Sequence, residues 1–161
     1  MDKRDEIPRS GEIVSFRNNG CFVCGPENPI GLRCVFTHDG ENRRATTSVT
    51  FRKDHQGWDG IVHGGLLVSV LDDVMDHAIL SIGKLGLTTH MNITFRKAVK
   101  TGEEVRFEGE IIELKSRTAR THAIGYSSKN GDSGEKEIFV EAEGVYFLDS
   151  PEKTITKDSG E

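Results

Sequence analysis

The sequence predicts an α+β fold in which one antiparallel sheet wraps around a single long helix. Apolar residues recur with helical spacing from Gly64 to about Ser81 and leave only a thin polar strip, which describes a helix wrapped by a sheet. Two extended segments precede this helix and four follow it. One helix set among consecutive strands is typical of a layered α+β domain.

Length and composition set the size of this domain. The chain has 161 residues, of which 35% are apolar and 29% charged, and these values suit one domain with a core of ordinary size. Residues 1–18 are polar and residues 149–161 are largely charged or polar, so we expect both to be flexible segments. The domain is therefore expected to span residues 19–148.

The two extended segments before the helix are predicted to form a hairpin. Gly25–Gly31 is dense in turn-forming residues, and Leu32–Thr37 and Arg44–Phe51 then have extended patterns. In the second of these segments, Val49 and Phe51 fall on the same side.

The helix has a wide apolar face. This face is marked by Leu67, Leu71, Val74, Ala78 and Ile82. The polar strip opposite consists of Ser69, Asp72, Asp73 and Asp76. Because ionised carboxylates are costly to bury without partners, acids in the middle of such a helix are either paired structurally or placed for chemistry.

The strands after the helix follow in order. From Leu87 to Phe95 the residues alternate, which predicts Leu87, Met91, Ile93 and Phe95 on one face and Thr88, His90, Asn92 and Thr94 on the other. Further strands are predicted at Glu104–Leu114, with a bulge near Ile111, at Thr118–Ser127 and at Glu137–Leu148. Between the last two, Lys129–Gly134 has the composition of a loop.

Charge and hydropathy exclude several classes of partner. The net charge is -5 and the basic residues are dispersed, so we expect no nucleic acid partner. No apolar run approaches the roughly 20 residues that span a bilayer, and the N-terminus lacks the apolar region of a secretory signal. We therefore expect a cytoplasmic protein with no membrane partner, acting on a small molecule.

Three cysteines lie near the N-terminus. Cys21 and Cys24 have the spacing of half a zinc knuckle, but Cys34 and His38 do not supply a usual second half. We expect free thiols packed as small apolar groups, and no metal site.

Several segments together resemble a known family. They are Cys21–Leu32, His55–Trp58, the His-Gly-Gly turn within Gly60–Gly65, and Met91–Arg96. The His-Gly-Gly turn is followed by Asp at the ninth position after His63. In these features the chain resembles, over residues 20–148, the hotdog-fold thioesterases of the type that includes phenylacetate-pathway and mammalian acyl-CoA thioesterases.

The resemblance implies hydrolysis of an acyl-CoA thioester without a cofactor. It implies that Asp72 acts as general base or nucleophile and that the backbone amide of Gly64 polarises the thioester carbonyl. An amide at a helix N-terminus suits this role, because it has no partner within the helix. Further catalytic candidates are His63, Gln56 and Thr88. Candidates for substrate binding are Gly65, Asp73 and Asn92.

The spacing of the two main catalytic candidates predicts an oligomer. Gly64 and Asp72 are eight residues apart, which is roughly 12 Å along a helix. An oxyanion donor must lie about 3 Å from its oxygen, so the two groups can serve one carbonyl only if they come from different subunits. We therefore expect a symmetric homodimer with two interface sites, or a homotetramer built from it.

Four alternatives remain open. The chain could be a non-catalytic acyl-CoA binding protein, or a dehydratase or hydratase in which His55 or His63 faces an acid. Asp73 rather than Asp72 could be the catalytic acid. Either acid could instead have a structural role, paired with an arginine such as Arg96 or Arg120.

Overall fold

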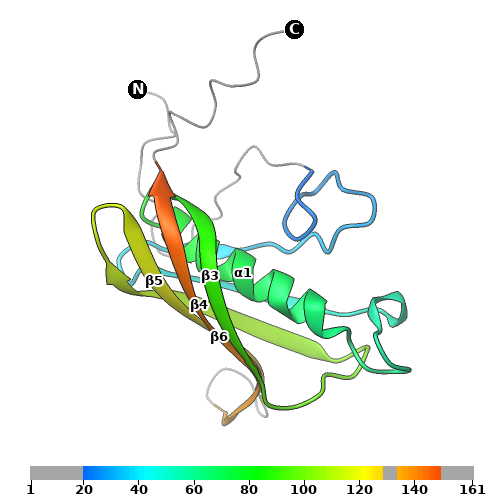
Figure 1. Ribbon diagram of the computed structural model, residues 1–161. Helices are drawn as coiled ribbons and strands as arrows, with labels where there is room; N and C mark the ends of the chain where they lie inside the picture. The colour runs from blue at the N-terminus through cyan, green and yellow to red at the C-terminus, as the bar shows by residue number, and fades with distance from the viewer. Residues whose placement is uncertain (1–19, 129–133, 150–161) are drawn as a thin grey trace, which may run out of the picture.

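The structure, a computed structural model, describes residues 20–128 and 134–149. One α-helix packs against a six-stranded antiparallel sheet, which curves around it (Figure 1). In chain order the elements are β1 (Thr37–Asp39), β2 (Arg44–Thr50), the 3₁₀ turn η2 (Lys53–His55), α1 (Gly64–Leu80), β3 (Leu85–Phe95), β4 (Glu104–Leu114), β5 (Thr118–Ser128) and β6 (Lys136–Asp149). The order across the sheet is β1-β2-β4-β5-β6-β3, and each neighbouring pair is antiparallel. The α+β prediction is confirmed.

The segments expected to be flexible fall mostly outside the described residues. Residues 1–18 lie wholly outside, and of residues 149–161 only Asp149, the last residue of β6, is described. The predicted loop at 129–134 likewise has only its last residue within the described part. Within that part, no helix has the length and apolar character needed to cross a bilayer.

The helix α1 matches its predicted limits within a residue. His63 caps its N-terminus, because the ring nitrogen Nδ1 accepts a hydrogen bond of 2.9 Å from the Gly65 amide. Four of the five residues of the predicted apolar face, Leu67, Leu71, Val74 and Ala78, are buried, and the fifth, Ile82, is partly buried beyond the helix end. Burying a side chain such as Leu71 stabilises the fold by about 1.5–3 kcal/mol, so this face holds the helix on the sheet.

The strands agree with the sequence pattern except at the first. The hairpin of β1 and β2 is present, but only Thr37 of the predicted first segment lies in β1. The residues before it instead follow the N-terminal loop: the Leu32 amide donates to the Phe22 carbonyl and the Cys34 amide to the Val23 carbonyl. In β4 the register shifts between Ile111 and Glu113, which confirms the predicted bulge.

The predicted facing of β3 is wrong at its first half. The register with β6 shifts between Thr88 and His90, so one residue is inserted and the alternation changes phase there. As a result Thr88 points toward α1, together with Met91 and Ile93, whereas Leu87 is 62% exposed. A strict period of two cannot reveal such an insertion, because the apolar pattern itself continues across it.

Candidate active site

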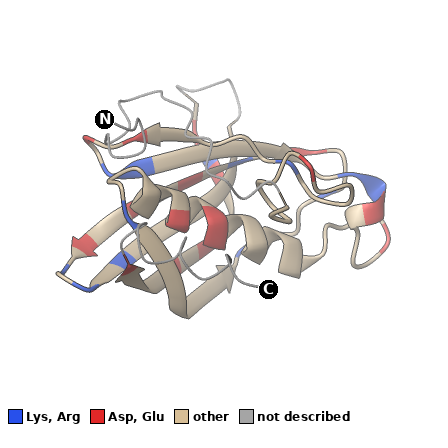
Figure 2. Cartoon of the chain, turned by 90° about the horizontal axis from the view of Figure 1, so that it is seen from above, with Lys and Arg blue, Asp and Glu red and all other residues tan. Residues whose placement is uncertain are grey.

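The three acids of α1 share a helix but not an environment. Figure 2 shows acidic positions and no Lys or Arg along α1, in agreement with its sequence. Asp72 faces β3 and β6, Asp73 faces the N-terminal loop, and Asp76 faces the start of β3.

Asp72 is held by two hydroxyl groups at one of its carboxylate oxygens. Thr88 Oγ1 and the Tyr146 hydroxyl each lie 2.7 Å from Asp72 Oδ1. Burial and the neighbouring Asp72 raise the pKa of Tyr146, so this phenol remains a donor. No described residue hydrogen-bonds to Oδ2 of Asp72, and the residue is only half-buried, so this oxygen is available to accept a hydrogen bond from water or a ligand.

Sequence analysis did not identify Tyr146 as a site residue. Its ring is fully buried on β6, and its hydroxyl also lies 3.1 Å from the Asp72 main-chain oxygen. A tyrosine at an inward position of an apolar strand gives a weak signal, since a buried hydroxyl needs a polar partner. Which partner it finds depends on how the helix lies across the sheet.

Asp73 and Asp76 are both poorly solvated. Burial raises the pKa of Asp73 to about 6, with a further contribution from the charge of Asp72. Burial also raises the pKa of Asp76 to about 7, although Asp76 Oδ1 accepts a 3.0 Å hydrogen bond from the Gly86 amide. Asp73 lies beside the thiols of Cys21 and Cys24.

We expect Asp76→Asn to change how stability depends on pH. Because the pKa of Asp76 is higher in the folded than in the unfolded chain, its contribution to stability is fully present below about pH 4 and is lost as the pH rises through about 7. The facing groups are Asp72 and Asp73 on α1, which disfavour the charge, and the Gly86 amide and Tyr146 hydroxyl on the sheet. The Asn side chain keeps an acceptor for Gly86 and carries no charge.

The measurement is the free energy of unfolding of both proteins at pH 5 and pH 8, at equal protein concentration. Between these values the wild type should lose at least about 1 kcal/mol relative to the variant, since one pKa unit corresponds to about 1.4 kcal/mol. Other titrating groups are common to both proteins and cancel in the comparison. If the free energy of unfolding changed equally with pH in the wild type and in Asp76→Asn, ionised Asp76 would not destabilise the fold.

The turn before α1 is held by backbone and side-chain hydrogen bonds. The His63 amide donates to the His55 carbonyl at 3.0 Å, and Gln56 Oε1 accepts a 3.0 Å hydrogen bond from the Gly60 amide. Gln56 therefore fixes this turn through its carbonyl oxygen. Because His63 Nδ1 takes the Gly65 amide, that amide is occupied by the helix cap.

Gly64 is the first residue of α1, and its amide differs from that of Gly65. No described residue accepts a hydrogen bond from the Gly64 amide. A Cβ added at Gly64 would lie 3.2 Å from the Phe95 ring, so the ring lies close to the backbone here. An unpaired amide at the positive end of the helix dipole is a suitable donor to a developing negative charge.

The structure thus groups the predicted site residues at two places. Asp72 and Thr88 meet at the middle of α1, while Gly64, Gly65, His63 and Gln56 gather at its N-terminus. Asn92 belongs to neither group. It is exposed, it lies opposite Glu143 on β6, and its position in the alternation of β3 directs its side chain away from α1.

The alternative in which Asp72 pairs with an arginine is wrong for the described residues. Arg96 lies 2.6 Å from Glu141, and Arg120 lies 3.4 Å from Glu143. Both arginines therefore pair on the sheet, and the neighbours of Asp72 are uncharged hydroxyl groups.

Of the two histidines considered for a dehydratase, His55 does not face an acid of α1. His55 Nδ1 accepts a 3.1 Å hydrogen bond from the Arg52 amide, and burial lowers the pKa of the ring. The carboxylate near its Nε2 is that of the adjacent, exposed Asp54, at 4.0 Å. His55 thus forms part of the 3₁₀ turn η2.

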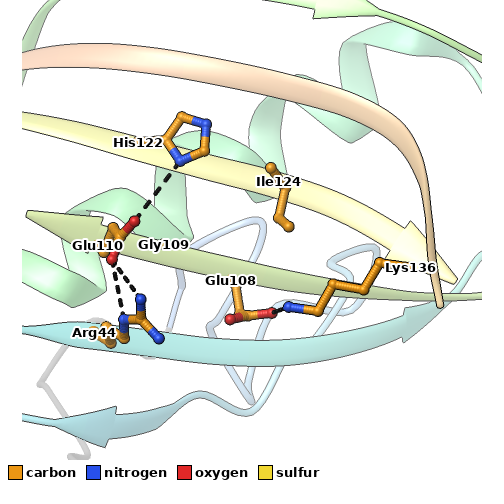
Figure 3. Close-up of a pocket in the computed structure, with 7 residues that line it drawn as sticks. All are labelled: Arg44, Glu108, Gly109, Glu110, His122, Ile124 and Lys136. Carbon is orange, nitrogen blue, oxygen red and sulfur yellow. Dashed lines mark hydrogen bonds and ion pairs between the residues drawn. The ribbon is translucent and has the colours of Figure 1, made fainter. Parts of the chain in front are cut away.

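A hollow of about 200 Å³ lies on the opposite face of the sheet (Figure 3). Glu108 and Glu110 line it, alternating along β4 with Gly109, whose Cα faces α1. Arg44 lies 2.7 Å from Glu110, and Lys136 lies 2.5 Å from Glu108. These charges compensate one another, so the hollow presents a solvated ion-pair surface and we place no site there.

Known proteins with a similar sequence or fold include thioesterase superfamily members and acyl-CoA thioesterases. Residues 59–133 match the sequence model of the thioesterase superfamily, a segment that includes Gly64, Asp72 and Thr88. Acyl-coenzyme A thioesterase THEM4 of Bos taurus is 24% identical over 135 residues, which are 84% of this chain and 54% of that protein. The chain spans about half the length of the curated relatives it matches.

Solved structures share the fold. Protein RHA08564, a thioesterase superfamily protein, has a TM-score of 0.69 at 23% identity and covers 84% of this chain and 66% of its own. The protein smu.793 from Streptococcus mutans, solved bound to acetyl CoA, has a TM-score of 0.60 at 16% identity, with 68% and 83% covered. The fold of this chain is therefore that of thioesterase superfamily proteins, and the resemblance to hotdog-fold thioesterases is confirmed.

Proposed function

Because the chain has the hotdog fold of the thioesterase superfamily, we propose that it hydrolyses an acyl-CoA thioester to a free acid and CoA. The observation that carries the proposal is Asp72, held at Oδ1 by Thr88 and Tyr146 and with Oδ2 open. The similarity to acyl-coenzyme A thioesterase THEM4 and to a protein solved with acetyl CoA supports the choice of substrate class.

The reaction follows from the chemistry of these groups. Asp72 Oδ2 takes a proton from water, and the resulting hydroxide attacks the thioester carbonyl carbon. Alternatively, the carboxylate attacks that carbon itself, and water then cleaves the acyl-Asp72 anhydride. In both routes the carbonyl oxygen gains negative charge, which a backbone amide at a helix start stabilises. The C–S bond breaks, the CoA thiolate leaves and takes up a proton, and no cofactor takes part.

The proposal requires two subunits. Asp72 and Gly64 lie eight residues apart on α1, roughly 12 Å along its axis, so one chain cannot bring both to one carbonyl. A partner subunit must supply the second group. We place the Gly64 amide of the partner opposite Asp72, in a homodimer with two equivalent sites.

The edge strand β3 supports this arrangement. Among the described strands β3 pairs only with β6, so its other edge is open, and Leu87 and Phe95 are 62% and 55% exposed. Near one end of β3, Thr88 contacts Asp72, and at the other end the Phe95 ring lies close to Gly64. Antiparallel pairing of two β3 strands about their midpoint would bring Thr88 opposite the partner's Phe95, and therefore Asp72 toward the partner's Gly64.

The first experiment measures release of free thiol from short, long and aromatic acyl-CoAs, together with binding of the same compounds. We expect turnover of at least one class and concentration-independent dimers in the assay range. Binding of CoA esters without turnover would instead identify a non-catalytic acyl-CoA binding protein. A monomer that remains active would contradict the two-subunit site.

A further inference from the structure

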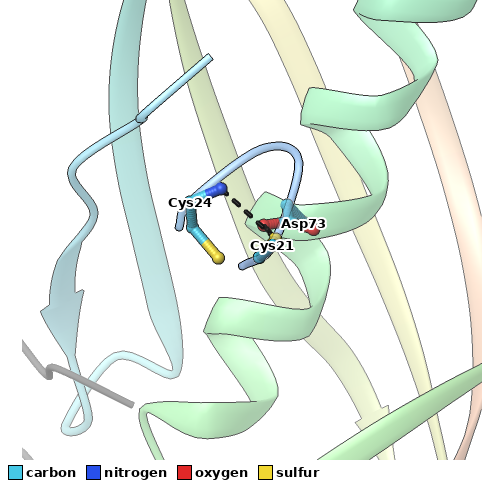
Figure 4. Close-up of side chains that lie close together, drawn as sticks. All are labelled: Cys21, Cys24 and Asp73. Atoms are coloured by element: carbon cyan, nitrogen blue, oxygen red, sulfur yellow. Dashed lines mark hydrogen bonds between the residues drawn. The ribbon is translucent and has the colours of Figure 1, made fainter. Parts of the chain in front are cut away.

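Two cysteines and one acid form a cluster outside the proposed reaction site. Cys21 and Cys24 lie on the N-terminal loop, Asp73 lies on α1, and one ligand atom of each residue falls within 4.8 Å of the others (Figure 4). Cys21 Sγ is 3.8 Å from Asp73 Oδ2. Fifty-two positions separate Cys21 from Asp73, so the fold itself brings these residues together.

The loop already has the shape that a metal knuckle needs. The Cys24 amide points at Cys21 Sγ with a distance of 3.3 Å, and the Gly25 amide donates to the Cys21 carbonyl at 2.9 Å. The thiolate is the form of cysteine that binds metal. Two thiols are thereby held on one side of a tight turn.

From this geometry we propose that Cys21, Cys24 and Asp73 bind a zinc ion, with His77 Nε2 completing a tetrahedral site. Zn–S bonds of about 2.3 Å and Zn–O or Zn–N bonds of about 2.0 Å place tetrahedral ligand atoms about 3.3–3.8 Å apart. The 3.8 Å between Cys21 Sγ and Asp73 Oδ2 already meets this requirement. On binding, each thiol releases its proton, so two protons are released for the two thiolates.

His77 has the position and the support of a metal ligand. It lies one helical turn after Asp73, and its Nε2 is 3.9 Å from Asp73 Oδ2. Its other ring nitrogen, Nδ1, lies 2.9 Å from His38 Nε2, and the ring stacks on Phe36 with centroids 3.9 Å apart. Metal-bound histidines are usually oriented by such a hydrogen bond at the second nitrogen.

The donor set favours zinc over the alkaline earth metals. Two thiolates, an imidazole and a carboxylate suit Zn²⁺, whereas Mg²⁺ and Ca²⁺ prefer oxygen ligands. Cys21, Cys24 and Asp73 form the cluster, and His77 Nε2, 3.9 Å from Asp73 Oδ2, would move toward the ion as the fourth ligand. Four protein ligands make the site structural, tying the N-terminal loop to α1. The sequence led us to expect free thiols because the second half of the knuckle is absent nearby. The helix supplies that half instead.

The inference is tested on the full-length protein by metal analysis and by cobalt substitution. We expect one zinc per chain after purification, and a chelated sample that takes up one Zn²⁺ or one Co²⁺. The cobalt form should show thiolate-to-metal charge transfer and the intense d–d bands of tetrahedral Co²⁺. Uptake of less than one metal ion per chain, or a cobalt spectrum without thiolate bands, would contradict the proposed zinc site. Both measurements use the wild-type protein, so neither depends on the folding of a variant.

Variants then identify the ligands. Cys21→Ser and Asp73→Asn should each weaken zinc affinity by at least about 10-fold. Cys34→Ala is the matched thiol control and Asp72→Asn the matched acid control, and both should keep one zinc per chain. Loss of zinc in a control, or its full retention in Cys21→Ser, would contradict the ligand set.

The zinc readout is independent of the proposed reaction. A protein that binds zinc through these residues but hydrolyses no acyl-CoA would refute the proposed function alone. An active thioesterase without zinc would refute the metal site alone.

Discussion

Asp72→Asn is expected to lower thiol release from the best acyl-CoA substrate by about 100-fold or more. The amide cannot accept the proton of water or attack a carbonyl, so it abolishes both routes proposed for Asp72. It still offers an oxygen to Thr88 and Tyr146, which now bond to Asp72 Oδ1 at 2.7 Å each. The fold should therefore be retained, and substrate binding should change little.

The matched control for this variant is Asp76→Asn. It makes the same chemical change one helical turn later, where the side chain accepts from the Gly86 amide instead. We expect Asp76→Asn to keep turnover within a few-fold of the wild type at neutral pH. Tyr146→Phe, which removes one donor to Asp72, should give a smaller loss than Asp72→Asn. Equal activity of Asp72→Asn and wild type would exclude Asp72 as base and nucleophile.

The second large effect is expected from Gly64→Pro, which deletes one amide hydrogen. Proline is favoured at the first helical position, and His63, with φ -61° and ψ 126°, has the conformation that a following proline requires. Because the Gly64 amide has no acceptor among the described residues, its removal should cost little stability. Loss of an oxyanion donor typically lowers turnover by about 100- to 1,000-fold.

Gly64→Ala distinguishes the effect of losing the amide hydrogen from the effect of adding side-chain atoms. Alanine brings a Cβ to 3.2 Å from the Phe95 ring, as proline does, but keeps the amide hydrogen. We expect Gly64→Ala to retain most of the turnover that Gly64→Pro loses. Equal losses in the two variants would assign the effect to Phe95 and not to the donor.

Mixing the two inactive variants tests whether the site is shared between subunits. In a heterodimer of Asp72→Asn with Gly64→Pro, one interface site has both native groups and the other has neither. Random exchange makes half of the dimers mixed, so about one quarter of the wild-type activity should return. If each subunit used its own Asp72 and Gly64, no activity would return on mixing.

The sequence predicted the helix and most strands because their signals are local. The spacing of Leu67, Leu71 and Val74 defines a face whether or not the sheet is known, and the limits of α1 agree within a residue. The bulge at Thr89 was missed, since an inserted residue changes the phase of a strand without changing its composition. That error matters for the site, because the bulge turns Thr88 toward Asp72.

The candidate site was only partly visible in the sequence. Asp72 and Gly64 could be named because the His-Gly-Gly turn, with Asp at the ninth position after His63, resembles that of the hotdog-fold thioesterases. Tyr146 is 74 positions from Asp72, and the Cys21 thiol reaches Asp73 across 52 positions. Neither contact has a local signal, because each depends on how the helix is laid across the sheet and how the N-terminal loop returns to it.

The cap at His63 has a consequence for how this protein can evolve. Helix starts leave several amides unpaired, and a side chain that satisfies one of them stabilises the helix. Here His63 takes the Gly65 amide and leaves that of Gly64 unpaired. Stability and activity therefore depend on neighbouring but separate amides. Substitutions at His63 can change the stability of the fold while the Gly64 amide remains available. The usual trade-off between stability and activity is therefore reduced at this helix start.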